Sequence, residues 1–308
     1  MIQNNGTTGS QKIGENSLFN RASRLLEKYF GITMVSPILL VLTLLLLGPL
    51  VYTIFLSFHT WFAGSGPPSF VGLENFTRLL NSQEFLKSLR VTAMFTGGSL
   101  ALEIALGIGL AQLLNRDFIG KSLVRTVLIL PLASTPVALS LVWRLMLLPD
   151  LGILNYFIEL VGFSQVTFLS SSRLIIPTLI VIDAWRWTPL IMLIAMASMA
   201  SIPDTYYQAA RVDGASPFQQ FVHITLPLIR PAVIVAAMLR FMDSLKQFDM
   251  IFVLTQGGPG TSSRILNLFV YDNAFRYFHL GYASAAVVIM ILLIAGFSLI
   301  LSRLRRST

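Results

Sequence analysis

The feature that most constrains this chain is a long apolar segment without charge. Residues 33–58 read TMVSPILLVLTLLLLGPLVYTIFLSF and contain no Asp, Glu, Lys or Arg. A helix needs about 20 predominantly apolar residues to cross the hydrocarbon core of a bilayer. The segment meets that requirement and is too long for the apolar part of a signal peptide. We therefore expect it to remain in the protein as a membrane-spanning helix.

Five further segments predict spans of the same kind. They are residues 91–114, 126–147, 174–200, 231–255 and 279–302. Charged residues make up only 12% of the chain, against about 25% in typical soluble domains. A soluble core cannot cover this much apolar surface, so lipid must be the solvent for much of it. The sequence predicts an all-α membrane protein with six transmembrane helices in residues 31–308, preceded by a tail of residues 1–30.

Lys and Arg are distributed unequally between the two sides of these spans. Of the 22 basic residues, twelve lie on the side of both termini, six on the opposite side and four within spans. Cytoplasmic loops carry an excess of Lys and Arg. We therefore expect both termini and the loop 201–230 in the cytoplasm, and the loop 256–278 outside. The net charge of +8 reflects this placement and is not a sign of nucleic-acid binding.

The loop 201–230 predicts two short helices joined by a turn. It reads SIPDTYYQAARVDGASPFQQFVHITLPLIR and is too polar to span. Residues 204–212 have helical composition, and Gly214 follows where a helix can end. Ser216 and Pro217 then suit the cap and first residue of a second amphipathic helix. Such a pair forms a protrusion that could fit a cleft on another protein, or an amphipathic surface resting on lipid.

The same loop resembles the signature of ABC importer permeases. That signature is Glu-Ala-Ala, three residues, Gly, nine residues, Ile, one residue and Leu-Pro. The matching residues here are Gln208, Ala209, Ala210, Gly214, Ile224, Leu226 and Pro227. The stretches FVGLENFTRLL (70–80), LVWRLMLLPDLGILN (141–155) and FDMIFVLTQGGPG (248–260) are similar to the binding-protein-dependent sugar-uptake branch, which is of the maltose permease type.

The resemblance covers nearly the whole chain after residue 30 and implies a type I ABC importer permease fold. It implies that the loop 201–230, including Asp213, docks in a groove of a separate ATPase subunit. It further implies an assembly of two permeases, which we expect to differ from each other, two ATPase subunits and an external solute-binding protein. Gln208 departs from the usual Glu, so a salt bridge from this position to the ATPase is lost, although an amide still donates and accepts.

Ionisable residues within a span are costly and are functional candidates by default. Arg240, Asp243, Lys246 and Asp249 are spaced three apart with alternating signs. They predict either the polar lining of a translocation path or a self-neutralising structural ladder packed against other helices. Glu103 is alone on a glycine-rich span, and we expect it to hydrogen-bond a neighbouring helix rather than substrate.

The fourth span contains Asp183, Trp185, Arg186 and Trp187. An aromatic face and a guanidinium suit a sugar, because the ring covers the C–H face and the polar group bonds the hydroxyls. The alternative is an interfacial aromatic belt with an ion pair. We interpret Trp187 as part of such a belt and place Arg186 on the path. Trp143 and Arg144, at the outer end of the third span, are interpreted as interfacial anchors.

A tight turn is predicted in the external loop from its glycines and proline. The residues concerned are Gly257, Gly258, Pro259 and Gly260. The turn is either a simple hairpin between spans or, as the resemblance implies, part of an external gate or of the contact with the binding protein. Tyr271 and Asn273 lie just beyond it and are further candidates for that contact.

Several function classes find no support in the sequence. No phosphate-binding loop of the form GxxxxGK[ST] occurs, so ATP and Mg²⁺ are expected on another polypeptide and no cofactor on this chain. The chain has no Cys, and its three His show no metal-ligand spacing. A secondary carrier driven by ions remains the alternative, although no internal repeat is visible. An intramembrane enzyme would need a nucleophile and base or a set of metal ligands within the spans.

Overall fold

The computed structural model describes the backbone of residues 12–306 and the side chains of residues 34–300 and Arg303. The chain forms two units, Met1–Phe55 and Leu56–Thr308. The described part of the first unit belongs to helix α1 (Lys12–Ser57), whose last two residues are in the second unit. Its segment Met34–Ser57 is long and apolar enough to cross a membrane, as predicted for residues 33–58. Residues 12–30 belong to the same helix as this segment.

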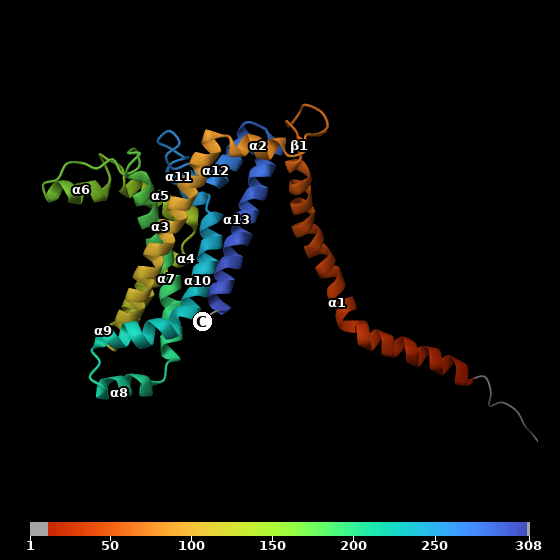
Figure 1. Ribbon diagram of the computed structural model, residues 1–308, viewed down its shortest axis with the longest axis horizontal. Coiled ribbons are helices and arrows are strands. Elements are labelled where there is room, and N and C mark those ends of the chain that lie inside the picture. Colours follow the sequence, from red (N-terminus) through yellow and green to blue (C-terminus); the bar gives the residue numbers. More distant parts are fainter. Residues whose placement is uncertain (1–11, 307–308) are drawn as a thin grey trace, which may run out of the picture. The chain divides into compact units, whose positions relative to one another are not determined.

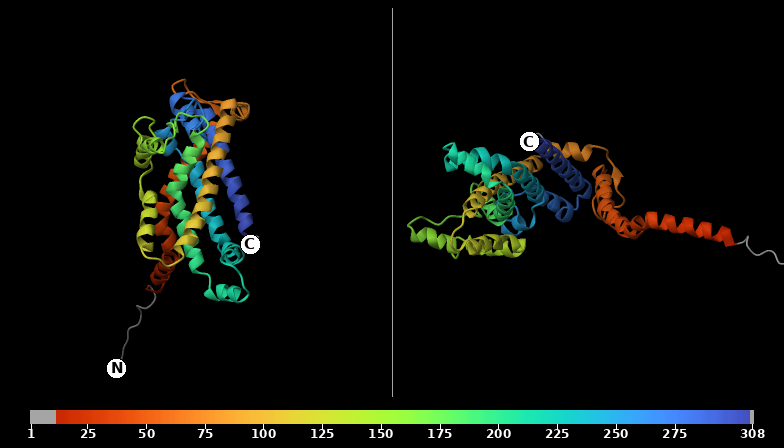
Figure 2. Two further views of the ribbon diagram at one scale, coloured as in Figure 1. Left: turned by 90° about the vertical axis from the view of Figure 1, so that its left-hand side faces the viewer. Right: turned by 90° about the horizontal axis from the view of Figure 1, so that it is seen from below.

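Four long helices run side by side in the second unit (Figures 1 and 2). They are α3 (Gln83–Leu114), α7 (Ile175–Ala200), α10 (Leu226–Leu245) and α13 (Leu280–Arg306). All four belong to segments that are long and apolar enough to span a membrane. The second, fourth and sixth predicted spans are therefore confirmed as helices, and α3 begins earlier than predicted, at Gln83.

Glycines of α3 allow its close packing against α7. A Cβ built on Gly107 would lie 2.7 Å from side-chain atoms of Ile191, and one on Gly98 would lie 2.5 Å from Ile180. A real Cβ atom does not approach another side chain at these distances, so a larger residue would require a shift. Small residues therefore let membrane helices pack closely. Gly98 and Gly107 thus allow α3 and α7 to approach closely at these two positions.

Two predicted spans are not single helices. The third, predicted over 126–147, consists of α4 (Lys121–Ala133) and α5 (Pro136–Met146), which are bent by 103° relative to each other. The break falls at Ser134 and Thr135 because a residue before proline disfavours helical geometry and Pro136 suits a first helical position. The described part of the chain thus has five helices able to span a membrane, or six if the bent pair is one span.

The fifth predicted span, 231–255, also differs from the structure. Helix α10 ends at Leu245, and a short helix, α11 (Asp249–Leu254), follows. The Asn267 side-chain amide donates to the carbonyls of Leu245 and Gln247, both at 3.1 Å. An amide from a distant segment therefore satisfies carbonyl groups that the end of the helix leaves free.

Short elements cover the two ends of the helix bundle (Figures 1 and 2). One end carries α2, α6, α11, α12, η2 and a two-stranded antiparallel sheet. The bounds are β1 (His59–Thr60), β2 (Ser69–Phe70), α2 (Glu74–Leu80), α6 (Ile153–Leu160), α12 (Leu266–Tyr271) and η2 (Asp272–Arg276). The opposite end carries α8 (Asp204–Val212), α9 (Pro217–Gln220) and the π-helical turn η1 (Phe221–Thr225). Two apolar clusters fill the bundle between the ends, both centred on the contact of α3 with α7.

Candidate functional site

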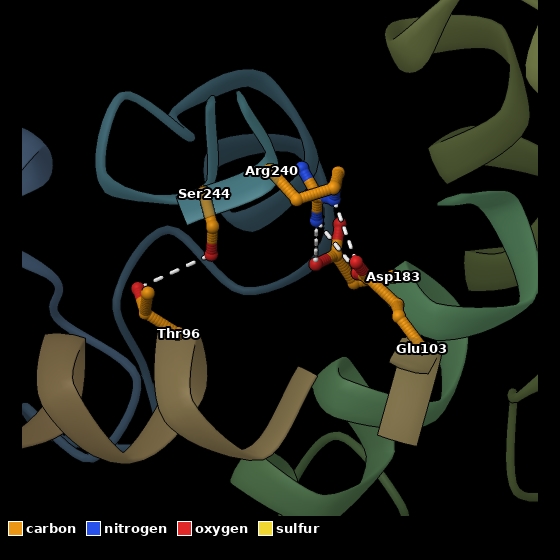
Figure 3. A network of polar contacts seen from close by, with 5 residues as sticks. All are labelled: Thr96, Glu103, Asp183, Arg240 and Ser244. Carbon is orange, nitrogen blue, oxygen red and sulfur yellow. Dashed lines mark hydrogen bonds and ion pairs between the residues drawn. The ribbon is translucent and has the colours of Figure 1, made fainter. Parts of the chain in front are cut away.

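A buried charge cluster joins the three central helices (Figure 3). Arg240 of α10 donates from Nε and Nη2 to the two carboxylate oxygens of Glu103 on α3, each at 2.7 Å. Its Nη2 also donates to Asp183 Oδ2 on α7, at 2.8 Å. The three residues are at most 1% exposed. One guanidinium therefore neutralises and hydrogen-bonds carboxylates from two other helices.

The cluster changes two of the predicted roles. Arg240 and Asp183 were candidates for a polar path, but their side chains are buried in ion pairs between helices and do not line an open path in this conformation. Arg240 also does not form the predicted ladder with Asp243. Glu103 hydrogen-bonds a neighbouring helix, as predicted. Since an unpaired charge within a membrane helix costs several kcal/mol, the mutual pairing fixes which faces of α3, α7 and α10 meet.

Trp187 lies against this cluster rather than in an interfacial belt. The guanidinium carbon of Arg240 is 4.6 Å from the centre of its ring, and that of Arg186 is 5.1 Å away. Cation–π attraction is significant within about 6 Å, and it is strongest for Trp and for desolvated cations. The predicted belt role of Trp187 is therefore wrong, because its ring contacts two arginines within the unit.

Arg186 bridges to the break in the third span. Its Nη2 donates to the Ser134 carbonyl at 3.4 Å, and its side chain is largely buried. Its Nε is buried without a hydrogen-bond partner. Irregular backbone at membrane depth is tolerated where protein groups satisfy it or where it lines a cavity. Arg186 thus satisfies one carbonyl at the break and keeps a donor available for another ligand.

Trp185 lies on the other side of α7 and is half exposed. Its ring meets Trp143 of α5 edge-to-face, with ring centres 5.4 Å apart. Trp185 also lines a groove of about 390 Å³ between α3, α4 and α7, together with Pro131 and Thr188. The Thr188 hydroxyl is buried without a hydrogen-bond partner. The groove combines an aromatic ring and a hydroxyl beside the break between α4 and α5.

The remaining charges of the predicted stripe lie where α10 ends. Lys246 and Asp243 form an ion pair at 3.3 Å with side chains 61% and 45% exposed. Asp249 is exposed and is the first residue of α11. Because the helix ends between them, the four charges do not form one stripe, but Asp243, Lys246 and Asp249 remain accessible polar groups. Arg144 is exposed and donates to the Val253 carbonyl at 3.2 Å, which ties α5 to α11.

The glycine-rich loop around residues 257–260 is a compact structure rather than a simple hairpin. Gly257 and Gly260 have φ of 91° and 60°, which glycine adopts at little cost. The Ser263 hydroxyl lies 2.7 Å from the Thr255 hydroxyl and donates to the Gly258 carbonyl at 2.6 Å. Pro259, which follows Gly258, lines a mixed polar and apolar cavity of about 320 Å³ at the loop's surface.

An ion-pair network behind this loop was not predicted. Arg264 pairs with Asp272 at 2.8 Å and with Glu84 at 3.3 Å, and Asp272 also pairs with Arg276 at 3.1 Å. The network ties the loop to the start of α3 and to η2. Arg264 and Glu84 are 180 residues apart, so no local pattern pointed to their pairing, whereas Asp272 and Arg276 pair locally at i,i+4.

Tyr271 and Asn273 were predicted to touch a docked protein, and the structure corrects this for Asn273. Asn273 is 7% exposed, and its amide donates to the Phe269 carbonyl within the helix. Tyr271 is partly buried between Phe248 and Phe252, with ring centres 5.2 and 5.5 Å away. The Asn273 side chain is therefore occupied inside the unit, since the π-helical turn directs it inward.

At the opposite end, α8 and α9 form the predicted pair of short helices (Figure 1). The Ala215 amide donates to Ala210 O at 2.8 Å, and the Gly214 amide donates to Arg211 O at 3.1 Å. This pattern is a Schellman motif, which needs a left-handed residue, and Gly214 has φ of 77°. Ser216 and Gln219 form a capping box, and Pro217 is the first residue of α9.

The second helix of this pair is not separate from the span, contrary to the prediction. Helix α9 passes through η1 into α10, so that Pro217–Leu245 is one candidate span. Ile224, Leu226 and Pro227 therefore lie on a continuous helix rather than in a loop. The hydroxyls of Tyr207 and Thr225 lie 2.9 Å apart and tie α8 to η1.

The outer surface of this helix pair is not covered within the described part of the chain. Val212 is 88% and Phe218 74% exposed. Gln208, Ala209, Asp213 and Gly214 are also exposed, and Ala210 is half-buried. Large exposed apolar side chains beside polar ones are typical of a surface that meets another protein or a membrane.

Comparison with known proteins identifies the family. Residues 103–308 match the family described as Binding-protein-dependent transport system inner membrane component. The Trehalose/maltose transport system permease protein MalF of Thermococcus litoralis is 34% identical over 91% of this chain and 95% of its own length. The Trehalose transport system permease protein SugA of Mycobacterium tuberculosis is 31% identical over 89% of this chain and 88% of its own.

A solved structure supports the fold independently. A chain of the bacterial alginate ABC transporter, solved in complex with an alginate pentasaccharide-bound periplasmic protein, superimposes with a TM-score of 0.80. It shares 22% identity and covers 92% of this chain and 96% of its own. The predicted ABC importer permease fold is therefore confirmed. Because residues 103–308 match the family and the similarity to its members extends over most of the chain, this chain belongs to the binding-protein-dependent transport system inner membrane components, which are the non-enzymatic permease subunits of ABC importers.

Proposed function

We propose that this chain passes a sugar or polyol, with a disaccharide such as trehalose as the leading candidate, from an external binding protein across the membrane. The observation that carries the substrate class is the similarity to two permeases of trehalose systems over most of the chain. The assembly contains this chain, a second and different permease, two ATPase subunits and one binding protein. ATP and Mg²⁺ bind the ATPase subunits.

The substrate path in this chain follows the break in the third span. Trp185 offers an aromatic face, while the Thr188 hydroxyl and the Arg186 Nε have no partner within the described residues. A sugar presents an apolar face of C–H groups and a rim of hydroxyls, which suits a ring with nearby polar groups. Asp243, Lys246 and Asp249 supply further polar groups where α10 ends.

Substitution of Trp185 tests this path. Trp185→Ala is expected to lower sugar uptake about tenfold, since loss of a stacked aromatic ring costs on the order of 1–2 kcal/mol. Trp185→Phe should retain most uptake because a ring remains. The measurement is initial uptake in proteoliposomes with equal amounts of assembled transporter. Normal uptake by the alanine variant would remove Trp185 from the path.

Helix α8 is proposed as the contact with the ATPase. Its exposed face, the fixed turn at Gly214 and the Tyr207–Thr225 contact give a rigid protrusion attached to the α10 span. A displacement of α8 by the ATPase would therefore be transmitted to α10 and to the charge cluster at Arg240. The same helix would be cytoplasmic, and the elements around α6 and α12 external.

Cysteine labelling tests this orientation. The chain has no Cys, so Ser216→Cys and Ser164→Cys each give a single site in an exposed turn. An impermeant thiol reagent added to intact spheroplasts is expected to modify position 164 and to leave position 216 unmodified until the membrane is permeabilised. Modification of position 216 in sealed cells would reverse the proposed topology.

The substrate class is tested on the binding protein of the same system. Thermal-shift measurements of that protein with mono- and disaccharides, polyols and amino acids should show stabilisation by a sugar or polyol, because a ligand that binds the folded state raises its stability. The stabilising compound should then be taken up by proteoliposomes that contain the whole assembly. Stabilisation by an amino acid alone would overturn the substrate assignment.

A further inference from the structure

A polar cavity lies behind α8, on the side that faces the helix bundle. It has a volume of about 500 Å³. The end of α3 and the following turn contribute Gln112, Asn115 and Arg116, while α8 and α9 contribute Tyr207, Arg211 and Gln220. The cavity lies on the side of α8 opposite to its exposed face. It is also distinct from the groove at Trp185, because the two share no lining residue.

The lining of the cavity carries more positive than negative charge. Arg116 and Arg211 both line it, and neither forms an ion pair or a side-chain hydrogen bond within the described part of the chain. Asp204 is the one acidic residue in the lining. A guanidinium presents a planar set of donors that matches the oxygens of a phosphate group. The lining therefore favours an anionic ligand.

The cavity also provides groups suited to hydroxyls. The Gln112 Oε1 atom is buried and has no hydrogen-bond partner. Buried polar atoms normally have a partner, so an acceptor left free in a cavity points to an absent donor. Asn115 adds a second amide. A ligand with a phosphate and neighbouring hydroxyls would satisfy both the arginines and these amides.

The cavity lies at the end of a candidate span, where lipid head groups would lie in a bilayer. Helix α3 is a candidate span that ends at Leu114, and Arg116 follows two residues later. Apolar side chains flank this end of the span, with Leu113 64%, Phe118 43% and Ile119 fully exposed. Basic pockets at span ends on the cytoplasmic side bind anionic phospholipid head groups. Acyl chains would meet the apolar residues while the phosphate enters the cavity.

We propose that this cavity binds the phosphate and glycerol of an anionic phospholipid from the leaflet next to α8. Such a lipid would bridge the end of α3 to α8 and thereby fix the angle of the helix that meets the ATPase. The effect on coupling rests on the proposed function, whereas the binding of the lipid does not. Phosphatidylglycerol carries the required groups and serves as the probe.

Binding is measured on the purified, fully assembled transporter by native mass spectrometry with phosphatidylglycerol or phosphatidylcholine added. We expect retention of phosphatidylglycerol in preference to phosphatidylcholine. Arg116→Gln and Arg211→Gln should each lower its affinity about fivefold, the factor expected for one basic contact to an anionic lipid. Arg125→Gln is the matched control, because Arg125 is exposed on α4 and does not line the cavity.

A protection experiment locates the lipid without altering the arginines. Ala215 lines the cavity and Ser216 does not. Phosphatidylglycerol in nanodiscs should slow maleimide modification of Ala215→Cys but not of Ser216→Cys, relative to phosphatidylcholine. Equal retention of both lipids, or no protection at position 215, would overturn the proposal. Displacement of the lipid by inorganic phosphate alone would assign the site to a soluble anion and would also overturn it. Loss of uptake with unchanged lipid binding would concern the proposed function instead.

Discussion

Gly214→Leu is expected to impair coupled transport severely while the protein still inserts into the membrane. The left-handed φ of 77° at this position costs a residue with a side chain roughly 1–2 kcal/mol. A Cβ here meets no atom within 4 Å, so we expect the damage to arise from the turn and from the proposed ATPase contact rather than from the interior. Uptake should fall about tenfold or more, since about 1.4 kcal/mol corresponds to tenfold.

Two variants separate the possible causes of this loss. Gly162→Leu is the matched control, because Gly162 also has a positive φ of 90° and open space around it, but lies after α6 at the opposite end. Its uptake should stay near normal. Gly214→Asn should be milder than Leu, since Asn tolerates the left-handed region. Co-purification of the ATPase and ATP hydrolysis stimulated by the loaded binding protein are measured. Normal values of both for Gly214→Leu would refute the coupling role of α8.

Arg240→Met is expected to prevent accumulation of the folded protein. It leaves Glu103 and Asp183 buried without their cation, and breaking a buried pair in this way costs about 3–5 kcal/mol. Adding Glu103→Gln and Asp183→Asn should restore much of the folded protein, because the uncompensated charges are then removed. The measurement is the yield and thermal stability of purified, assembled transporter.

Lys246→Met is the control for that comparison. Its pair with Asp243 has both side chains largely exposed, and exposed pairs contribute about 0–1 kcal/mol. The thermal stability of the Lys246→Met transporter should therefore change little, even if the variant alters uptake. If Arg240→Met matches Lys246→Met in stability, or if the triple variant is no more stable than Arg240→Met, the cluster does not hold the three helices together.

The sequence predicted most of the helices because lipid imposes a simple length and polarity requirement. It missed the breaks at Ser134 and at Lys246 because an apolar run looks continuous whether or not the helix bends within it. The partner of Glu103 could be stated only as a neighbouring helix. Arg240 is 137 residues away, and spacing within one segment suggested pairing with Asp243 instead.

The local turn at α8 was more predictable than the charge cluster. The conformational preferences of the residue types Gly, Ser and Pro predict the turn at Gly214, Ser216 and Pro217. The Schellman motif and the capping box follow from these preferences. The roles of Trp187 and Asn273 depended on which side of a helix faces the interior. Polar and apolar residues are mixed around both positions, so periodicity gave no direction.

The central claim is that this chain transports through an ATPase bound at α8. The direct measurement is uptake of the binding protein's ligand into proteoliposomes that contain both permeases and the ATPase. Uptake is compared with ATP inside the vesicles, with ATP outside them, and without ATP under an imposed proton or sodium gradient. We predict uptake that requires ATP on the ATPase side and the loaded binding protein, and that does not respond to either gradient. Uptake driven by a gradient without ATP or binding protein would contradict the account and favour an ion-driven carrier.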